Sequence, residues 1–264
     1  MSFRFGWAFK QFFSIREFFF HRAVLKSPWK FYYFILLKLI PGLHKQAVDL
    51  TLLSGGVIRV REFMTLYIYK EIFIDRCYDG VPVESKSPLI VEIGANTGLC
   101  TLRFKECFPD SRIICFEPYP PNFEALLETI DANCLNGVVP INKAVGGEIG
   151  LIKLFIHPTN VGGHSIVDGD LKDFVEVEST TVDALLSENG VESCDIMKMD
   201  CEGAELQILR SFTRETARKV KSIIYEPTHG SYSVQELNGF LENLGYSVWS
   251  RHGLVIASML ERQG

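Results

Sequence analysis

Several features that would place a protein in a class at once are missing from this sequence of 264 residues. No apolar run reaches 18 residues, the length at which a stretch becomes a candidate for a membrane-spanning helix. The seven cysteines include no pair with the C-x₂₋₄-C spacing of a zinc site. There is also no internal repeat and no low-complexity tract, so neither a repeat architecture nor a disordered chain is indicated.

The cysteines are odd in number and scattered, which favours free thiols over a disulfide framework. Several lie in apolar contexts, where a buried and reduced thiol is the usual state. With 47% hydrophobic and 22% charged residues, the chain can bury a sizeable core. We therefore expect a folded enzyme in a reducing compartment, the cytoplasm.

The most informative stretch is VEIGANTGLCTLRF, residues 91–104, which has the pattern of a buried strand, a glycine turn and a helix. Gly94 and Gly98 let the backbone approach a ligand closely, and the helix N-terminus offers free N–H groups. The usual dinucleotide fingerprint needs glycines at its first, third and sixth positions, but Asn96 stands at the third. Glu92, two residues before the first glycine, would repel a pyrophosphate and suit a cationic ligand.

This acid-x-Gly-x-x-x-Gly turn resembles motif I of class I S-adenosylmethionine (SAM) methyltransferases. The resemblance implies that SAM is the cofactor and that Glu92, or the loop backbone at Gly94 and Gly98, holds its amino-acid end. Asn96 of the same turn is also expected to bind the cofactor. Another nucleotide or a purely structural turn remains an alternative from these residues alone.

A second acid, Glu117, ends the apolar strand 112–117 and lies 19 residues after Gly98. In a βαβ unit, an acid about 20 residues after the glycine turn can bind both ribose hydroxyls of a nucleoside. We therefore expect Glu117 to bind the ribose, the alternative being a carboxylate that only flanks the following helix. Asn142, at the end of the next strand, is expected to contact the adenine edge or to cap a turn.

From residue 88 onward, strands and helices alternate along the chain. The expected strands are 88–93, 112–117, 138–145, 194–200 and 221–226. The expected helices are 97–108, 122–134, 183–189, 204–212 and 233–244. A β-rich insertion is expected at 150–157 and 174–182, and a hairpin at 246–251 and 254–259. This alternation predicts an α/β fold, a Rossmann-like doubly wound, mostly parallel sheet. The methyltransferase resemblance implies seven strands, one of them antiparallel.

A third motif narrows the family. The stretch KMDCEGAE, residues 198–205, resembles the signature of FkbM-like methyltransferases, and the resemblance continues in FEPYPPNFEAL, INKAVGG, STTVDALL and IIYEPTHG. It covers roughly residues 66–257 and implies a SAM-dependent O-methyltransferase whose acceptor is a hydroxyl of a sugar, a glycolipid or a secondary metabolite. An N-methyltransferase of a protein or small amine, and a catalytically silent SAM-binding module, are the alternatives.

Three carboxylates crowd this motif and are the expected catalytic residues, Asp200, Glu202 and Glu205. Methyl transfer to a hydroxyl requires alignment and removal of a proton, and a carboxylate among like charges has the raised pKa of a base. Glu202 and Glu205 are three apart and would share a helix face, where the helix dipole is an alternative reason for their presence. His164 and His229 are alternative bases. No compact metal motif is present, and no metal is expected, although Asp200 with Glu226 would suit magnesium.

The charge is unevenly distributed. Residues 1–42 hold seven Lys or Arg against one Glu, a net charge of +6, and 14 of the 32 aromatic residues. We expect a helical extension at 1–45 and a methyltransferase domain at 46–264. The segment 1–42 could cap the core, contact a peripheral membrane surface or form a dimer contact. Nucleic acid is not an expected partner, because the remaining residues carry a net charge of −11.

Overall fold

The computed structural model describes residues 15–40, 42–43, 45–157, 163–167, 173–228 and 232–260. The chain divides into two compact units, Met1–Arg76 and Cys77–Gly264, which are described separately. His229 and residues 1–14 of the basic extension lie outside the described residues. Within the described part of the chain, no helix is long and apolar enough to cross a membrane.

The first unit combines two helices of the predicted extension with a hairpin and a further helical segment. Its elements are α2 (Ile15–Val24), α3 (Trp29–Leu39), β1 (Val48–Thr51), β2 (Val57–Val60), α4 (Phe63–Tyr69) and the π-helix η1 (Lys70–Ile74). The strands β1 and β2 pair antiparallel. The domain boundary at residue 45 stays a prediction, since it concerns where the methyltransferase domain begins.

Aromatic side chains form the interior of this first unit. Phe31, Phe34 and Tyr69 are fully buried, and so is His21. The His21 ring stacks on Phe31 with ring centroids 3.9 Å apart, and its Nδ1 lies 3.4 Å from the Tyr69 hydroxyl. Phe31 and Phe34 of the extension therefore help to build a small core of the first unit, whereas Phe19, Phe20, Trp29 and Tyr33 are exposed.

The second unit contains a seven-stranded sheet with the order β11-β12-β10-β9-β3-β4-β5. Its strands are β3 (Leu89–Ile93), β4 (Arg112–Phe116), β5 (Val138–Ile141), β9 (Cys194–Met199), β10 (Val220–Tyr225), β11 (Ser247–Arg251) and β12 (Leu254–Ser258). Strand β12 pairs antiparallel with both of its neighbours, and the other strands are parallel. The predicted fold class is confirmed, including the single antiparallel strand in the closing hairpin.

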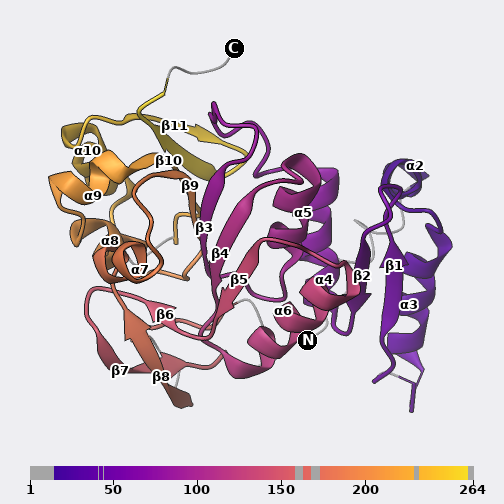
Figure 1. Cartoon of the computed structure of the whole chain (residues 1–264). Coiled ribbons are helices and arrows are strands. Elements are labelled where there is room, and N and C mark those ends of the chain that lie inside the picture. The colour runs from indigo at the N-terminus through magenta and orange to yellow at the C-terminus, as the bar shows by residue number, and fades with distance from the viewer. Residues whose placement is uncertain are drawn as a thin grey trace. The chain divides into compact units, whose positions relative to one another are not determined.

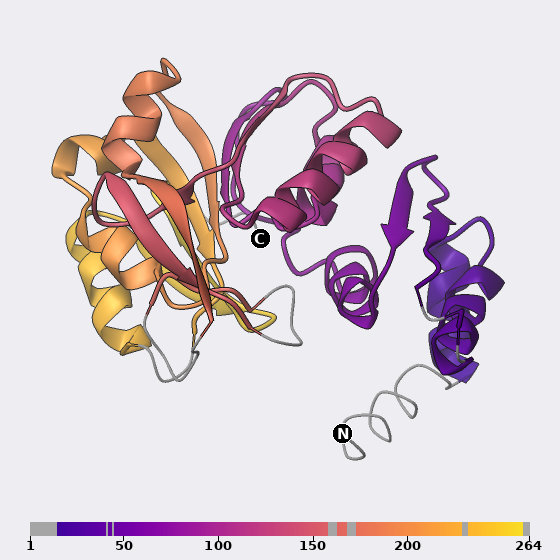
Figure 2. The ribbon, with the colours of Figure 1, turned by 90° about the horizontal axis from the view of Figure 1, so that it is seen from below.

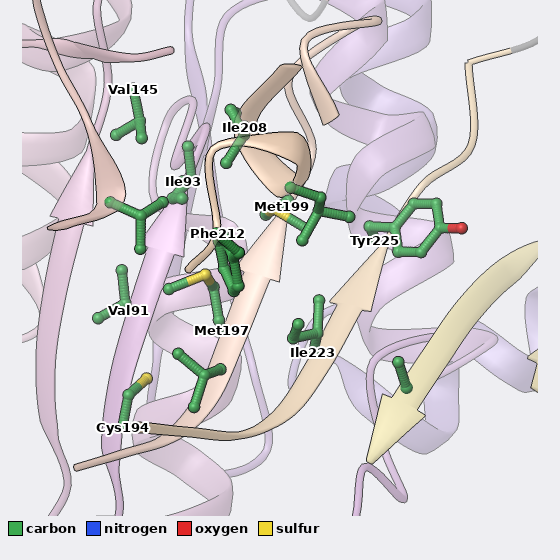
Figure 3. Close-up of a cluster of buried hydrophobic side chains, with 14 of the residues drawn as sticks. Val91, Ile93, Val145, Cys194, Met197, Met199, Ile208, Phe212, Ile223 and Tyr225 are labelled. Carbon is green, nitrogen blue, oxygen red and sulfur yellow. The ribbon is translucent and has the colours of Figure 1, made fainter. Parts of the chain in front are cut away.

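Helices cover both faces of this sheet. In Figures 1 and 2, α5 and α6 lie on one side, and α7, α8, α9 and α10 lie on the other. Their bounds are α5 (Leu99–Cys107), α6 (Pro120–Ala132), α7 (Val182–Glu188), α8 (Glu205–Arg210), α9 (Arg214–Lys219) and α10 (Val234–Asn243). Figure 3 shows side chains of β3, β9 and β10 meeting Ile208 and Phe212 in one buried cluster. This packing holds the carboxyl ends of the parallel strands in place.

Two local predictions are wrong. The expected strand 138–145 is broken, because β5 ends at Ile141 and β6 (Ala144–Val145) joins a separate three-stranded sheet with β7 (Gly150–Phe155) and β8 (Phe174–Thr180). Helix α9 was not expected, because its short sequence RETARK has no apolar stripe. Its start is set instead by Thr213, whose hydroxyl accepts a hydrogen bond from the Thr216 N–H.

Candidate active site

A pocket opens where β3, β4 and β9 end, with about 570 Å³ of empty space including the solvent at its mouth. This position agrees with the rule that open parallel sheets bind ligands at the carboxyl ends of their strands. The insertion between β6 and α7 supplies part of its wall. The lining residues are Ile93, Gly94, Asn96, Phe116, Glu117, Pro118, Asn122, Lys143, Ala144, Val145, Leu154, His164, Ile166, Asp200, Cys201, Glu202 and Ala204.

Gly94 and Gly98 are needed for different reasons. Gly94 has φ of 77°, and a Cβ at this position would lie 1.9 Å from the carbonyl oxygen of Asp200. Only glycine therefore lets the turn after β3 close against the end of β9. Gly98 has φ of 83° and approaches Leu126 of α6, so it brings two helices together and does not line the pocket.

Asn96 and Glu117 meet at the pocket. Asn96 has φ of 51°, and its N–H donates to Oε2 of Glu117 over 2.8 Å. The N–H of Tyr119 donates to Oε1 of the same carboxylate over 2.9 Å. Oδ1 of Asn96 is buried and has no hydrogen-bond partner among the described residues. A buried acceptor without a partner at a pocket wall is suited to a donor from a ligand.

Glu117 is buried, and its environment changes its titration. Burial raises the pKa of Glu117 to about 7, although hydrogen bonds from Tyr119 and Asn96 act in the opposite direction. An ionised carboxylate has about four acceptor positions. Two backbone donors and the side chain of Asn122 occupy three of them, which leaves about one for a ligand. The carboxylate can therefore accept a hydrogen bond from a ribose hydroxyl, and Asn122 beside it also lines the pocket.

Glu92 does not line the pocket. It is fully buried, accepts a hydrogen bond from the Thr101 hydroxyl over 2.6 Å, and has Nζ of Lys198 4.0 Å from its Oε1. Lys198 also donates to the carbonyl of Gly94 over 2.6 Å. The acid of the motif therefore lies beneath the glycine turn. Direct contact of its carboxylate with a cofactor stays a prediction.

Asp200 and Glu202 both line the pocket but differ in their surroundings. Oδ2 of Asp200 lies 3.5 Å from Nζ of Lys198 and at the same distance from the hydroxyl of Tyr78. Burial raises the pKa of Glu202 to about 8, and the nearby carboxylates of Asp200, Glu226 and Glu205 add to the rise. A carboxyl group with such a pKa at a pocket has the properties of a general base.

Glu205 supports the turn that presents these acids. Its carboxylate accepts hydrogen bonds from the N–H of Cys201 over 2.8 Å and of Gly203 over 3.0 Å. It is fully buried and does not line the pocket. Glu202 has φ of 51° and precedes α8, which begins at Glu205. The expectation that the two glutamates share a helix face is therefore wrong. A catalytic role for Glu205 stays a prediction.

The side-chain amide of Asn142 donates to the carbonyl of Glu117 over 2.7 Å and to that of Pro118 over 3.2 Å. These bonds fit the turn-capping alternative and hold the loop after β4, while contact with adenine stays a prediction. His164 lines the pocket and lies against Tyr119, with ring centroids 4.2 Å apart. Burial is the main reason why the pKa of His164 is lowered, which favours a neutral imidazole.

Apolar side chains of the insertion were missed by the sequence analysis. Leu154 of β7 and Ile166 line the pocket together with Lys143, which follows β5. Leu154 alternates with more exposed neighbours along β7, a pattern that indicates a buried face but not which cavity it borders. Only the folding of the insertion against the rim of the main sheet brings these residues to the pocket.

The fold and the pocket define a class I methyltransferase. A model of the family described as "Methyltransferase FkbM domain" matches residues 92–248, more than half of the chain. The chain therefore belongs to the FkbM methyltransferase family and is a SAM-dependent methyltransferase, as predicted.

Known methyltransferases are similar to this chain in sequence or in fold. The methyltransferase sdnD of Sordaria araneosa is 28% identical over 213 residues, covering 69% of this chain and 82% of that protein. The 2-O-methyltransferase NoeI of Sinorhizobium fredii is 27% identical and covers 59% and 67%. The crystal structure of methyltransferase FkbM from Methylobacillus flagellatus superposes with a TM-score of 0.51 at 18% identity, over 68% of this chain and 45% of that one. At that identity, the likeness concerns the fold.

The residues of the pocket fit SAM. Glu117 provides a free acceptor position for a ribose hydroxyl, and the buried Oδ1 of Asn96 is suited to a donor group. Ile93, Phe116 and Val145 offer apolar surface for a flat aromatic base. The acids around the pocket suit a cofactor that carries a sulfonium and an ammonium group.

Proposed function

We propose that this chain is an O-methyltransferase acting on a hydroxyl of a sugar, a glycolipid or a secondary metabolite. The observation that carries the proposal is Glu202, a pocket carboxylate whose pKa is raised to about 8. Hydroxyl acceptors need a base at the moment of transfer, and a carboxylate with a raised pKa is a stronger base than an ordinary one. The similarity to NoeI, a 2-O-methyltransferase, supports oxygen as the acceptor atom.

The acids at the pocket and in the turn beside it have separate parts in this proposal. SAM, when bound, supplies an electrophilic methyl group on a sulfonium. Glu117 and Asn96 hold the nucleoside end by accepting hydrogen bonds, and Glu202 accepts the proton of the acceptor hydroxyl. Asp200, whose Oδ2 lies 3.5 Å from Nζ of Lys198, orients the acceptor. Glu205 maintains the turn through its bonds to the backbone.

The insertion wall is the part of the pocket that we expect to contact the acceptor. Leu154 and Ile166 present apolar surface, and His164 presents an imidazole whose Nε2 has no partner among the described residues. Nδ1 of His164 accepts a hydrogen bond from the N–H of His157 over 3.1 Å, so the neutral ring carries its proton on Nε2 and can donate it to a sugar or metabolite hydroxyl. The pocket therefore combines an apolar wall with a few polar groups, as small-molecule sites commonly do.

The test is a methyl-transfer assay with isotopically labelled SAM on fractionated lipid, glycan and small-molecule extracts, with products identified by mass spectrometry. We expect label on oxygen. Label on nitrogen would replace the proposal with an N-methyltransferase, and SAM binding without transfer in any fraction would favour a silent module.

Variants assign the base. Glu202→Gln should lower turnover by a factor of about 10² or more, while the exposed Glu192→Gln serves as a matched control and should leave it unchanged. For the unmodified chain, kcat/KM should rise with pH and level off above about 8, because the base must be ionised. Glu202→Gln should lose this rise. If Asp200→Asn removes the rise instead, Asp200 is the base.

A further inference from the structure

Helix α3 in the first unit is apolar on two opposite faces. Phe31, Phe34 and Ile35 are buried on its inner side. On the other side Trp29 is 59% exposed and Leu36 is 54% exposed. A helix at the surface of a protein ordinarily carries polar residues on its outer face. The outer face of α3 therefore has the composition of a surface that meets a second apolar environment.

This outer face is continuous. Trp29, Tyr33 and Leu36 follow one another at spacings of four and three residues, which places them on one side of the helix. Ile40 follows at the C-terminal end and is 39% exposed, and Tyr33 is 41% exposed. The rings of Trp29 and Tyr33 are in edge contact, with centroids 5.9 Å apart. We call these four residues the α3 stripe.

The two lysines of α3 do not break the stripe, because their ammonium groups are engaged elsewhere. Lys30 donates to the carbonyl of Asp49 over 3.1 Å. Lys38 donates to the carbonyl of Arg61 and lies over the ring of Phe34, 4.9 Å from its centroid. Both bonds tie the helix to the segments around the β1–β2 hairpin. The outer face is therefore left to aromatic and aliphatic side chains.

The charge of the same unit indicates what the stripe meets. Residues 1–76 hold twelve Lys or Arg against five Asp or Glu, a net charge of +7, whereas residues 77–264 carry −12. Arg22 and Lys26 are exposed just before the stripe in the chain, and Lys45 is exposed just after it. Basic groups beside an apolar surface attract anionic lipid headgroups, each basic residue near the bilayer strengthening the attraction.

We propose that the α3 stripe docks the first unit on the surface of an anionic lipid bilayer, with α3 lying in the plane of the interface. Tryptophan and tyrosine favour this boundary because their rings are apolar and their polar atoms stay hydrated. A helix of 11 residues is too short to span a bilayer but suits an interfacial position. The docking does not depend on the proposed methyl acceptor.

The test is sedimentation of the full-length chain with vesicles of phosphatidylcholine alone and of phosphatidylcholine mixed with phosphatidylserine, without SAM or acceptor. We expect binding to the anionic vesicles only, and weaker binding as salt is added. Replacement of Trp29, Tyr33 and Leu36 by serine should weaken binding by at least about tenfold. Arg22→Glu combined with Lys26→Glu should weaken it by at least about thirtyfold.

A matched control uses exposed apolar residues of the other unit, Ile149 and Leu151, which are 69% and 70% exposed. Their replacement by serine should leave vesicle binding unchanged. Circular dichroism should show that every variant folds, since all altered side chains are exposed. Equal binding of the stripe variant and the unmodified chain would overturn the proposal, as would absence of binding at low salt. A stripe variant that dissociates a dimer in the absence of vesicles would assign the stripe to a second copy of the chain.

Discussion

Lys198 and Glu92 face each other across the adjacent parallel strands β9 and β3, with Nζ and Oε1 4.0 Å apart in the buried part of the sheet. The same Nζ donates to the carbonyl of Gly94 and lies 3.5 Å from Oδ2 of Asp200. Burial raises the pKa of Glu92, and the charge of Lys198 opposes that rise. One ammonium group thus compensates two acids and fixes the glycine turn beside the pocket.

Lys198→Met should destabilise the fold strongly. It would leave the Glu92 carboxylate buried without its counter-charge, a loss of about 3–5 kcal/mol in the free energy of unfolding, measured by urea denaturation. Lys221→Met is the control, because Lys221 forms a partly exposed ion pair with Asp195 in the same sheet and should cost about 0–1 kcal/mol. Adding Glu92→Gln to Lys198→Met should restore part of the stability. A double variant no more stable than Lys198→Met would contradict this account.

Gly94→Ala should lower the stability of the fold far more than replacement of another glycine that has a positive φ. Its Cβ would overlap the carbonyl oxygen of Asp200, whereas a Cβ at Gly190, with φ of 63°, meets nothing within 4 Å. We expect a cost of about 1–2 kcal/mol for Gly190→Ala, from backbone strain alone, and at least about 4 kcal/mol for Gly94→Ala. Thermal unfolding compares the two, and similar midpoints would show that the turn can move away from Asp200.

Glu117→Ala should weaken binding of SAM and of its demethylated product by about 1.5–3 kcal/mol, through the loss of a charge-assisted hydrogen bond. Isothermal titration measures both affinities. The control is Glu124→Ala, an exposed glutamate near the start of α6 that should leave them unchanged. Unaltered affinity for SAM in the Glu117 variant would show that other residues bind the ribose. An unmodified chain that binds NAD but not SAM would contradict the cofactor assignment.

His21 should make the folded state less stable as the pH falls. Burial, followed by the nearby charge of Lys70, lowers the pKa of His21 from 6.5 to about 4. The unfolded chain therefore takes up this proton more readily than the folded one. The contribution of His21 is complete above pH 6.5 and is lost as the pH falls toward 4, at a cost of up to about 3 kcal/mol. His21→Phe should reduce this dependence in denaturation curves recorded across that range. An unchanged pH profile would assign the acid sensitivity to other groups.

Apart from helix α9 and the break between β5 and β6, the sequence by itself determined the order of strands and helices in the second unit. Apolar runs bounded by acids, prolines and glycines mark β3, β4, β9 and β10, and the acids that follow them reach one edge because parallel strands end together. The glycine turn and the signature at 198–205 also identified the family, since both are local patterns that need no knowledge of packing.

Only the tertiary structure decided which acids face the pocket. Glu92 and Glu205 lie in sequence motifs as prominent as those of the pocket acids Glu117 and Glu202. In the structure, however, Glu92 faces Lys198 of the adjacent strand. Glu205 accepts hydrogen bonds from the backbone of the turn before α8. The left-handed conformation of Glu202 separates it from the helix that spacing alone suggests. Pairings between residues distant in the chain, and the path of the β7–β8 insertion, depend on packing free energies that no local pattern encodes.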